Sequence, residues 1–279
     1  MRHVQANLPR RPPNLLNRAE THHAPREVDV LVPSLKGLRS EFVAHLRSRI
    51  PVHHILTSSV AGLARARQEL IGRVDTEWFA FVDDDVRLRS DWWSTVTGMI
   101  RPDVGGVEGL WSYLAGDKRV DDYTRAMARL SGLLRQKSWR DRIDRAFTGD
   151  TLVRTEPVKD IRMPSIPLWE DEYIRRWVEK KGFRWQRTPH VVCDHLRTYN
   201  LKESYNTGMY GYWLGQLTVR TQFKRVAQLP LKVLFALAYT GDIHAGTFAV
   251  EKDLGVFKGV LQAHVRRKTR SPLYSLALQ

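Results

Sequence analysis

The chain has 279 residues, of which 42% are hydrophobic and 27% are charged. These values are ordinary for a globular protein and exclude a disordered, collagen-like or fibrous chain. A single cysteine, Cys193, excludes an internal disulfide framework and a multi-cysteine zinc site. The 45 Lys and Arg against 30 Asp and Glu give a formal net charge of +15, which favours anionic partners.

Residues 1–26 are rich in Pro, Arg and Asn and show no apolar periodicity, so we expect a basic, flexible amino-terminal arm. This arm lacks the apolar segment of a signal peptide. No apolar run in the chain reaches the ~18 residues that a membrane-spanning helix needs. We therefore expect a cytoplasmic protein.

The next part of the chain alternates between strand and helix patterns. Short β-branched or apolar runs predict strands at 28–32, 52–56 and 78–82, and the last is apolar throughout, as in a strand covered on both faces. Between them, apolar residues at helical spacing predict helices at 40–50 and 61–74, the second capped by Ser59. This order predicts an α/β domain with a mostly parallel sheet.

Further elements follow with a looser rhythm. We expect helices at 90–100 (capped by Ser90), 121–134 and 167–181, and strands at 105–111, 147–153 and 183–193. From residue 200 the pattern is mostly helical. The chain is therefore expected to have an α/β domain over 27–200 and a helical C-terminal region over 201–279.

Three consecutive carboxylates, Asp83, Asp84 and Asp85, directly follow the apolar strand 78–82. Ligands of open α/β sheets bind at the carboxyl ends of strands. Adjacent carboxylates repel one another and are best tolerated beside a cation. Oxygen ligands suit Mg²⁺ or Mn²⁺, which in turn suit phosphate oxygens. The alternative is a solvated loop whose aspartates cap a helix.

Two other groups carry chemistry. Glu170, Asp171 and Glu172 open the predicted helix 167–181, where acids favour the helix dipole and where a carboxylate beside a pocket is a credible general base. His195 lies just after the predicted strand 183–193, which ends at Cys193. A lone histidine is usually structural, but it is also a common metal ligand.

Together these features resemble the family 2-type inverting glycosyltransferases of the glycosyltransferase A fold. The resemblance is carried, in chain order, by VDVLVPS, ARARQELIGRVDTEWFAFVDDDVRLRSDWW, FTGDTLVRTE, WEDEYIRRWVEKKGFRW and HVVCDHL. It covers about residues 28–198 and is most specific at the aspartate run and at the Glu-Asp helix. It implies a Rossmann-like fold with a mostly parallel central sheet flanked by helices, followed by a helical C-terminal extension.

The resemblance also implies how a nucleotide-diphosphate sugar is bound. Asp83 and Asp85 hold Mn²⁺ or Mg²⁺ against the diphosphate, with His195 as a further metal ligand or as a diphosphate donor. Asp84 orients the ribose or a metal-bound water. Arg67 binds phosphate or supports the aspartate loop.

On the acceptor side, the resemblance assigns the general base to Asp171, which accepts the proton of the attacking hydroxyl. Glu170 supports this base or binds acceptor hydroxyls. The family usually has an aspartate after its second strand that contacts the nucleotide base, but VHHILTSSVAG contains no carboxylate. Pro33 and Ser34 are the candidates to replace it in donor binding, and the sequence does not identify the nucleotide.

Two other functions remain open from the sequence. A sugar-phosphate nucleotidyltransferase would share the α/β pattern and the acidic pocket, but it would want a glycine-rich loop after the first strand, where residues 33–37 contain a single glycine. A basic module that binds membrane or nucleic acid without catalysis would explain the charge but not the aspartate run.

The C-terminal region bears on the acceptor. An apolar run at 229–239, with Lys224, Arg225 and Lys232 nearby, could lie at an anionic membrane surface and serve a lipid-linked acceptor instead of a free carbohydrate. The alternative is a helix buried against the α/β domain.

Overall fold

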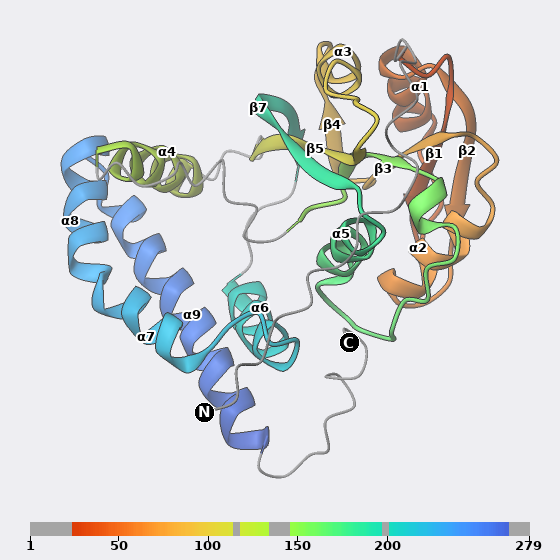
Figure 1. The fold of residues 1–279 in the computed structure, drawn as a ribbon. Coiled ribbons are helices and arrows are strands. Elements are labelled where there is room, and N and C mark those ends of the chain that lie inside the picture. Colours follow the sequence, from red (N-terminus) through yellow and green to blue (C-terminus); the bar gives the residue numbers. More distant parts are fainter. Residues whose placement is uncertain (1–23, 114–117, 134–145, 197–200, 268–279) are drawn as a thin grey trace.

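The computed structural model describes residues 24–113, 118–133, 146–196 and 201–267. Residues 1–23 of the expected basic arm lie outside this part of the chain. Figure 1 shows a twisted sheet with helices on both of its faces, and beside it a lobe of helices that includes the C-terminal region.

The described strands form one seven-stranded sheet in the order β2-β1-β3-β6-β5-β7-β4. β1 pairs in parallel with β2 and β3, and β5 pairs in parallel with β7. β6 is antiparallel to β3 and β5, and β4 is antiparallel to β7. Most strands therefore run in one direction, as predicted. Their bounds are β1 Val28–Pro33, β2 Val52–Ser58, β3 Trp78–Val82, β4 Val86–Leu88, β5 Val104–Tyr113, β6 Asp150–Arg154 and β7 Arg184–His195.

Side chains that alternate along β1 and β3 divide the core of the α/β part into two layers. Val30 and Ala80 pack in the layer that contains residues of α1 and α3. Leu31 and Phe81 pack in the layer that contains residues of α2 and α5. Burial on both faces explains why 78–82 is apolar throughout. The bounds are α1 Ser40–Arg49, α2 Leu63–Gly72, α3 Trp92–Thr97 and α5 Glu170–Lys180, with a 3-10 turn at Glu156–Val158.

Most predicted elements are confirmed, and the differences lie at their ends. Gly62 and Asp91 precede α2 and α3, so Ser59 and Ser90 are not their N-caps. Trp169 has a left-handed backbone, with φ of 75°, which delays the start of α5 to Glu170. β4 was not predicted, because a strand of three residues carries no readable periodicity.

The helical lobe has a core of its own, formed by residues of α4, α8 and α9 such as Tyr123, Ala236 and Phe248. α4 belongs to the 27–200 segment by sequence but packs here, and the division at residue 200 stays a prediction. No helix of the described residues combines the length and the apolar character that a membrane crossing requires. The bounds are α4 Lys118–Leu133, α6 Leu201–Trp213, α7 Val219–Ala227, α8 Leu229–Thr240 and α9 Ile243–Arg267.

Candidate active site

The three aspartates form the turn between β3 and β4, at the carboxyl end of the central strand. The Asp83 N–H donates to the Gly149 carbonyl over 2.9 Å, and the Val86 N–H donates to the Asp83 carbonyl over 3.0 Å. A Cβ on Gly149 would lie 2.8 Å from Asp83 Oδ2, so a glycine lets the β6 end approach this closely. The side chains of Asp83 and Asp85 are 22% and 28% exposed, which leaves both open to a ligand.

Arg67, on α2, connects this turn to the acidic start of α5. Its Nη2 lies 3.0 Å from Asp83 Oδ1, and its Nη1 lies 2.6 Å from Glu170 Oε1. Burial lowers the pKa of this guanidinium, but the nearby carboxylates outweigh burial and raise the pKa, so the side chain stays charged. Two acidic groups that lie far apart in the sequence are thus joined by one buried cation.

Asp84 faces the loop that follows β1. The Ser34 hydroxyl donates to Asp84 Oδ2 over 2.7 Å, and Pro33 is the last residue of β1. Beside this pair lies an open hollow of about 360 Å³, lined by Lys36, Gly37, Leu38, Arg39, Phe42 and Asp84. The basic residues of this hollow, Lys36 and Arg39, were not predicted as site residues, because the loop was judged by its glycine content. The available signal was a pair of basic residues directly after the first strand.

His195 lies beside Asp85 because β4 pairs with β7, which aligns Val86 with His195. His195 Nε2 is 3.6 Å from Asp85 Oδ1, and the Leu196 N–H donates to the Asp85 carbonyl over 2.7 Å. The imidazole packs against the rings of Trp111 and Phe147, each 5.8 Å away between centroids. These rings hold the imidazole in place, and no sequence pattern pointed to this contact.

Asp83, Asp85 and His195 offer the donor set of a divalent cation site. The ligand atoms of Asp83, Asp85 and His195 do not all lie within 4.8 Å of one another. Mg²⁺ and Mn²⁺ need one or two carboxylates and complete their coordination with water and substrate phosphate oxygens. Two partly exposed carboxylates with a nearby imidazole therefore suit an ion that also binds water and phosphate, and not one enclosed by protein ligands alone.

The first turn of α5 holds three buried carboxylates with different surroundings. Glu170 is the partner of Arg67. Glu172 accepts hydrogen bonds from Arg175, Arg176 and the Ala146 N–H. Burial raises the pKa of Glu172, but these hydrogen bonds outweigh burial and lower the pKa. Asp171 Oδ1 accepts from the Glu172 N–H over 2.9 Å, and Asp171 is 3% exposed.

Printed contacts thus link the predicted residues Ser34, Arg67, Asp83, Asp84, Asp85, Glu170 and His195 around the turn that follows β3. Glu170 and its neighbour Asp171 are each only 3% exposed. The Arg67 contact ties Glu170 to the aspartate turn instead of leaving it open to an acceptor. Arg176, in the middle of α5, hydrogen-bonds both Glu172 of the first turn and Gln216, which follows α6, so the helical lobe contacts α5.

Comparisons with known proteins identify the fold. No family profile matches the sequence. No curated protein matches it either. Among solved structures, the chain is similar to the mannosyltransferase PcManGT from Pyrobaculum calidifontis in complex with GDP-Man and Mn²⁺, with a TM-score of 0.51, 13% identity, and coverage of 89% of this chain and 77% of that one.

Glucosyl-3-phosphoglycerate synthase from Mycobacterium tuberculosis, in complex with Mn²⁺ and UDP-Glc, matches with a TM-score of 0.41 and 11% identity over 64% of this chain and 73% of that one. The likeness to PcManGT, together with the curled seven-stranded sheet and the helical C-terminal region, shows that this chain has a glycosyltransferase A-like fold.

Proposed function

We propose that this protein is a divalent-metal-dependent glycosyltransferase that moves a sugar from a nucleotide-diphosphate donor to an acceptor hydroxyl, with inversion at the anomeric carbon. The observation that carries the proposal is the cluster at the carboxyl edge of the sheet, where Arg67 joins the aspartate turn to Glu170 and where Ser34 and His195 flank that turn. The GDP-Man and Mn²⁺ bound by PcManGT support it.

On the donor side, Asp83, Asp85 and His195 would hold Mn²⁺ or Mg²⁺, which when bound supplies positive charge to the departing nucleoside diphosphate. Asp84, oriented by Ser34, binds a ribose hydroxyl. The hollow between Asp84 and the cations Lys36 and Arg39 accommodates the nucleotide part of the donor. Cations that flank a phosphate site add affinity through charge-assisted hydrogen bonds.

On the acceptor side, Asp171 is the general base. The resemblance at the Glu-Asp helix assigns this role to Asp171, and its neighbours Glu170 and Glu172 form ion pairs with Arg67 and Arg176. Proton removal by Asp171 as the hydroxyl attacks gives a single displacement and therefore inversion. Asp171 is 3% exposed, so this role requires its side chain to become accessible when the acceptor binds.

The acceptor is lipid-linked or lies close to a membrane, and the protein binds an anionic membrane surface peripherally. Exposed apolar side chains on α7 and α8, beside basic residues, support the membrane association. The alternative from the sequence was that the apolar run 229–239 is buried against the α/β domain.

The test of the catalytic proposal measures nucleoside diphosphate binding with and without Mn²⁺. Thermal shift with GDP, UDP, CDP and dTDP identifies the nucleotide, because a ligand raises the melting temperature when it binds the native state. Asp85→Asn should lose the Mn²⁺-dependent part of binding. The matched control Asp91→Asn, which removes the same charge from an exposed residue outside the site, should retain it.

A second arm addresses the base. Asp171→Asn keeps the shape of the side chain but cannot accept a proton, so turnover should fall ~10²–10⁴-fold with donor binding little changed. Unchanged Mn²⁺ dependence in Asp85→Asn would contradict the metal assignment. Near-normal turnover of Asp171→Asn would move the base to another carboxylate.

A further inference from the structure

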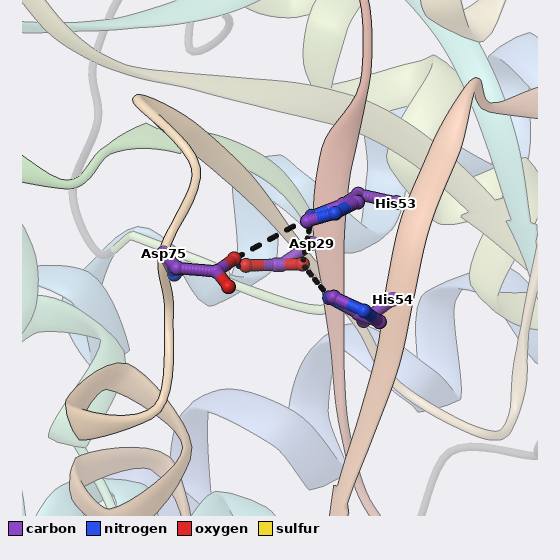
Figure 2. A group of neighbouring side chains, drawn as sticks. All are labelled: Asp29, His53, His54 and Asp75. Carbon is purple, nitrogen blue, oxygen red and sulfur yellow. Dashed lines mark hydrogen bonds and ion pairs between the residues drawn. The ribbon is translucent and has the colours of Figure 1, made fainter.

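A second group of metal-ligating side chains lies at the opposite end of the sheet from the aspartate turn. Asp29 is near the start of β1, His53 and His54 are near the start of β2, and Asp75 lies in the loop between α2 and β3 (Figure 2). The amino ends of parallel strands meet at this edge, whereas Asp83 follows the carboxyl end of β3. Nothing in the proposed glycosyl transfer uses these four residues.

An irregularity in strand pairing explains how two consecutive histidines reach one point. Val28 pairs with Val52 and Val30 pairs with Ile55, so the register shifts between these pairs and two residues of β2 face one residue of β1. Consecutive side chains of a regular strand point to opposite faces, and a bulge redirects one of them. The two imidazoles accordingly lie 3.8 Å apart between centroids and both approach Asp29 (Figure 2).

Asp29 is fully buried, and its two oxygens differ. Oδ2 accepts hydrogen bonds from the Asp75 N–H over 3.1 Å and from the Thr76 hydroxyl over 3.2 Å. Oδ1 is buried, has no hydrogen-bond partner and is aimed into the cluster, as is the buried His53 Nδ1. A buried carboxylate oxygen without a hydrogen bond is costly, and a cation held between Asp29 Oδ1 and the two imidazole nitrogens that face it would offset that cost.

The distances match those between ligands of a tetrahedral ion. Metal–ligand bonds of about 2.0–2.1 Å place two tetrahedral ligands about 3.4 Å apart. Asp29 Oδ1 is 3.4 Å from His53 Nδ1 and 3.3 Å from His54 Nδ1, and His53 Nδ1 is 3.4 Å from Asp75 Oδ1. All four ligand atoms lie within 4.8 Å of one another, and the exposed side chains of His54 and Asp75 are able to close the remaining gap.

We propose that Asp29, His53, His54 and Asp75 form a structural site for a transition metal of the Zn²⁺ class. Two imidazole nitrogens and two carboxylates favour Zn²⁺ over Mg²⁺ or Ca²⁺, which prefer all-oxygen sites. The hydrogen bonds to Asp29 Oδ2 orient the buried ligand in the way that outer partners orient metal ligands. The ion ties β1 and β2 to the loop that leads into β3 and stabilises the folded chain by mass action.

The test titrates Zn²⁺ into the full chain, stripped with a chelator and freed of any polyhistidine tag, by isothermal titration calorimetry. Asp85→Asn serves as the background, because it weakens the metal site of the proposed active site and keeps the two sites distinguishable. We expect one Zn²⁺ per chain in this background. His54→Gln and Asp75→Asn alter exposed ligands, so they should fold and should lower Zn²⁺ affinity by more than about 100-fold.

The matched control is His190→Gln. His190 has the same side-chain exposure as His54, 55%, and also faces one aspartate, Asp91, but it belongs to no group of three ligands among the described residues. This control should keep Zn²⁺ binding and the rise in melting temperature that Zn²⁺ causes, and Co²⁺ should give the visible absorption of a tetrahedral site. Equal Zn²⁺ affinity in His54→Gln and in the parent chain, or no Zn²⁺ bound in the Asp85→Asn background, would overturn the proposal.

Discussion

Arg67 is a buried cation whose two partners, Asp83 and Glu170, are brought together by the fold. A methionine at this position fills a similar volume but leaves the buried Glu170 carboxylate without its partner. Breaking a buried ion pair costs about 3–5 kcal/mol. The partial exposure of Asp83 places the expected loss for Arg67→Met at the lower end of that range.

Urea denaturation measures this loss directly. The double variant Arg67→Met/Glu170→Gln removes the uncompensated charge and should recover part of the free energy of unfolding. If Arg67→Met were as stable as the parent chain, Arg67 would serve the ligand and not the fold.

Asp150 supplies a prediction about pH. Burial raises its pKa well above the usual value of 3.8, and a hydrogen bond from Cys193 opposes this without reversing it. The folded chain therefore keeps a proton that the unfolded chain releases, so the free energy of unfolding falls as pH rises above 3.8. Asp150→Asn stays neutral and escapes this loss.

The stability of Asp150→Asn relative to the parent chain should therefore increase with pH, by up to about 1.4 kcal/mol per pH unit. Urea denaturation of both chains at pH 4.5 and pH 7.5 checks the sign. A difference that stays constant or shrinks with pH would show that Asp150 is ionised in the folded chain.

Single residues differ in how far the sequence reveals them. The aspartate turn was predictable because three carboxylates after an apolar strand are an unusual local pattern. The pairing of Asp29 with His53 and His54 was not, because it depends on a register shift that no local pattern reports. Asp150 was passed over because its burial depends on strands that are remote in the sequence.

At the scale of elements, the crossing of α6 and α9 depends on glycine. A Cβ on Gly208 would lie 2.0 Å from the Val256 carbonyl oxygen, which belongs to the backbone of the facing helix and cannot rotate away. Gly208→Ala should push the helices apart and lower the free energy of unfolding by about 1–3 kcal/mol.

Gly72→Ala is the control for this substitution. Gly72 is the last residue of α2, and a Cβ there would meet nothing within 4 Å. Alanine favours a helix over glycine, so this variant should be neutral or slightly stabilised. Thermal unfolding of both variants decides the matter, and equal melting temperatures would contradict the steric account.

Sequence patterns predicted individual strands but not their order in the sheet. β1 and β3 were predicted because strands buried on both faces favour short runs rich in β-branched or apolar residues. The antiparallel placement of β6 between two parallel groups was not predicted, since strand order depends on contacts between distant segments. The packing of α4 in the helical lobe has the same cause.

At the scale of the whole molecule, several large apolar side chains on α7 and α8 of the helical lobe are exposed to solvent. Phe223 is 62% exposed on α7, and Leu231, Leu234 and Tyr239 are 52%, 65% and 51% exposed on α8. α7 contains basic residues and no acidic one. Exposed apolar residues beside positive charge are the pattern of a helix that lies in an anionic membrane interface.

We therefore predict reversible binding of the chain to anionic vesicles, weakened by salt because screening reduces the attraction. Each basic residue near an anionic leaflet contributes about 1 kcal/mol, and burial of a leucine side chain contributes about 1.5–3 kcal/mol. Leu231→Ser/Leu234→Ser should thus reduce vesicle binding at least about tenfold.

The control is Val60→Ser, which changes an exposed apolar residue in the loop between β2 and α2 and should leave vesicle binding unchanged. Co-sedimentation with phosphatidylglycerol-containing and phosphatidylcholine vesicles measures both. Equal binding to the two vesicle types would contradict the role of the basic residues, because charge would then make no difference to binding. No binding to either type at low salt would favour an acceptor that is free in solution, because neither the charge nor the apolar residues of the lobe would then be engaged by a membrane.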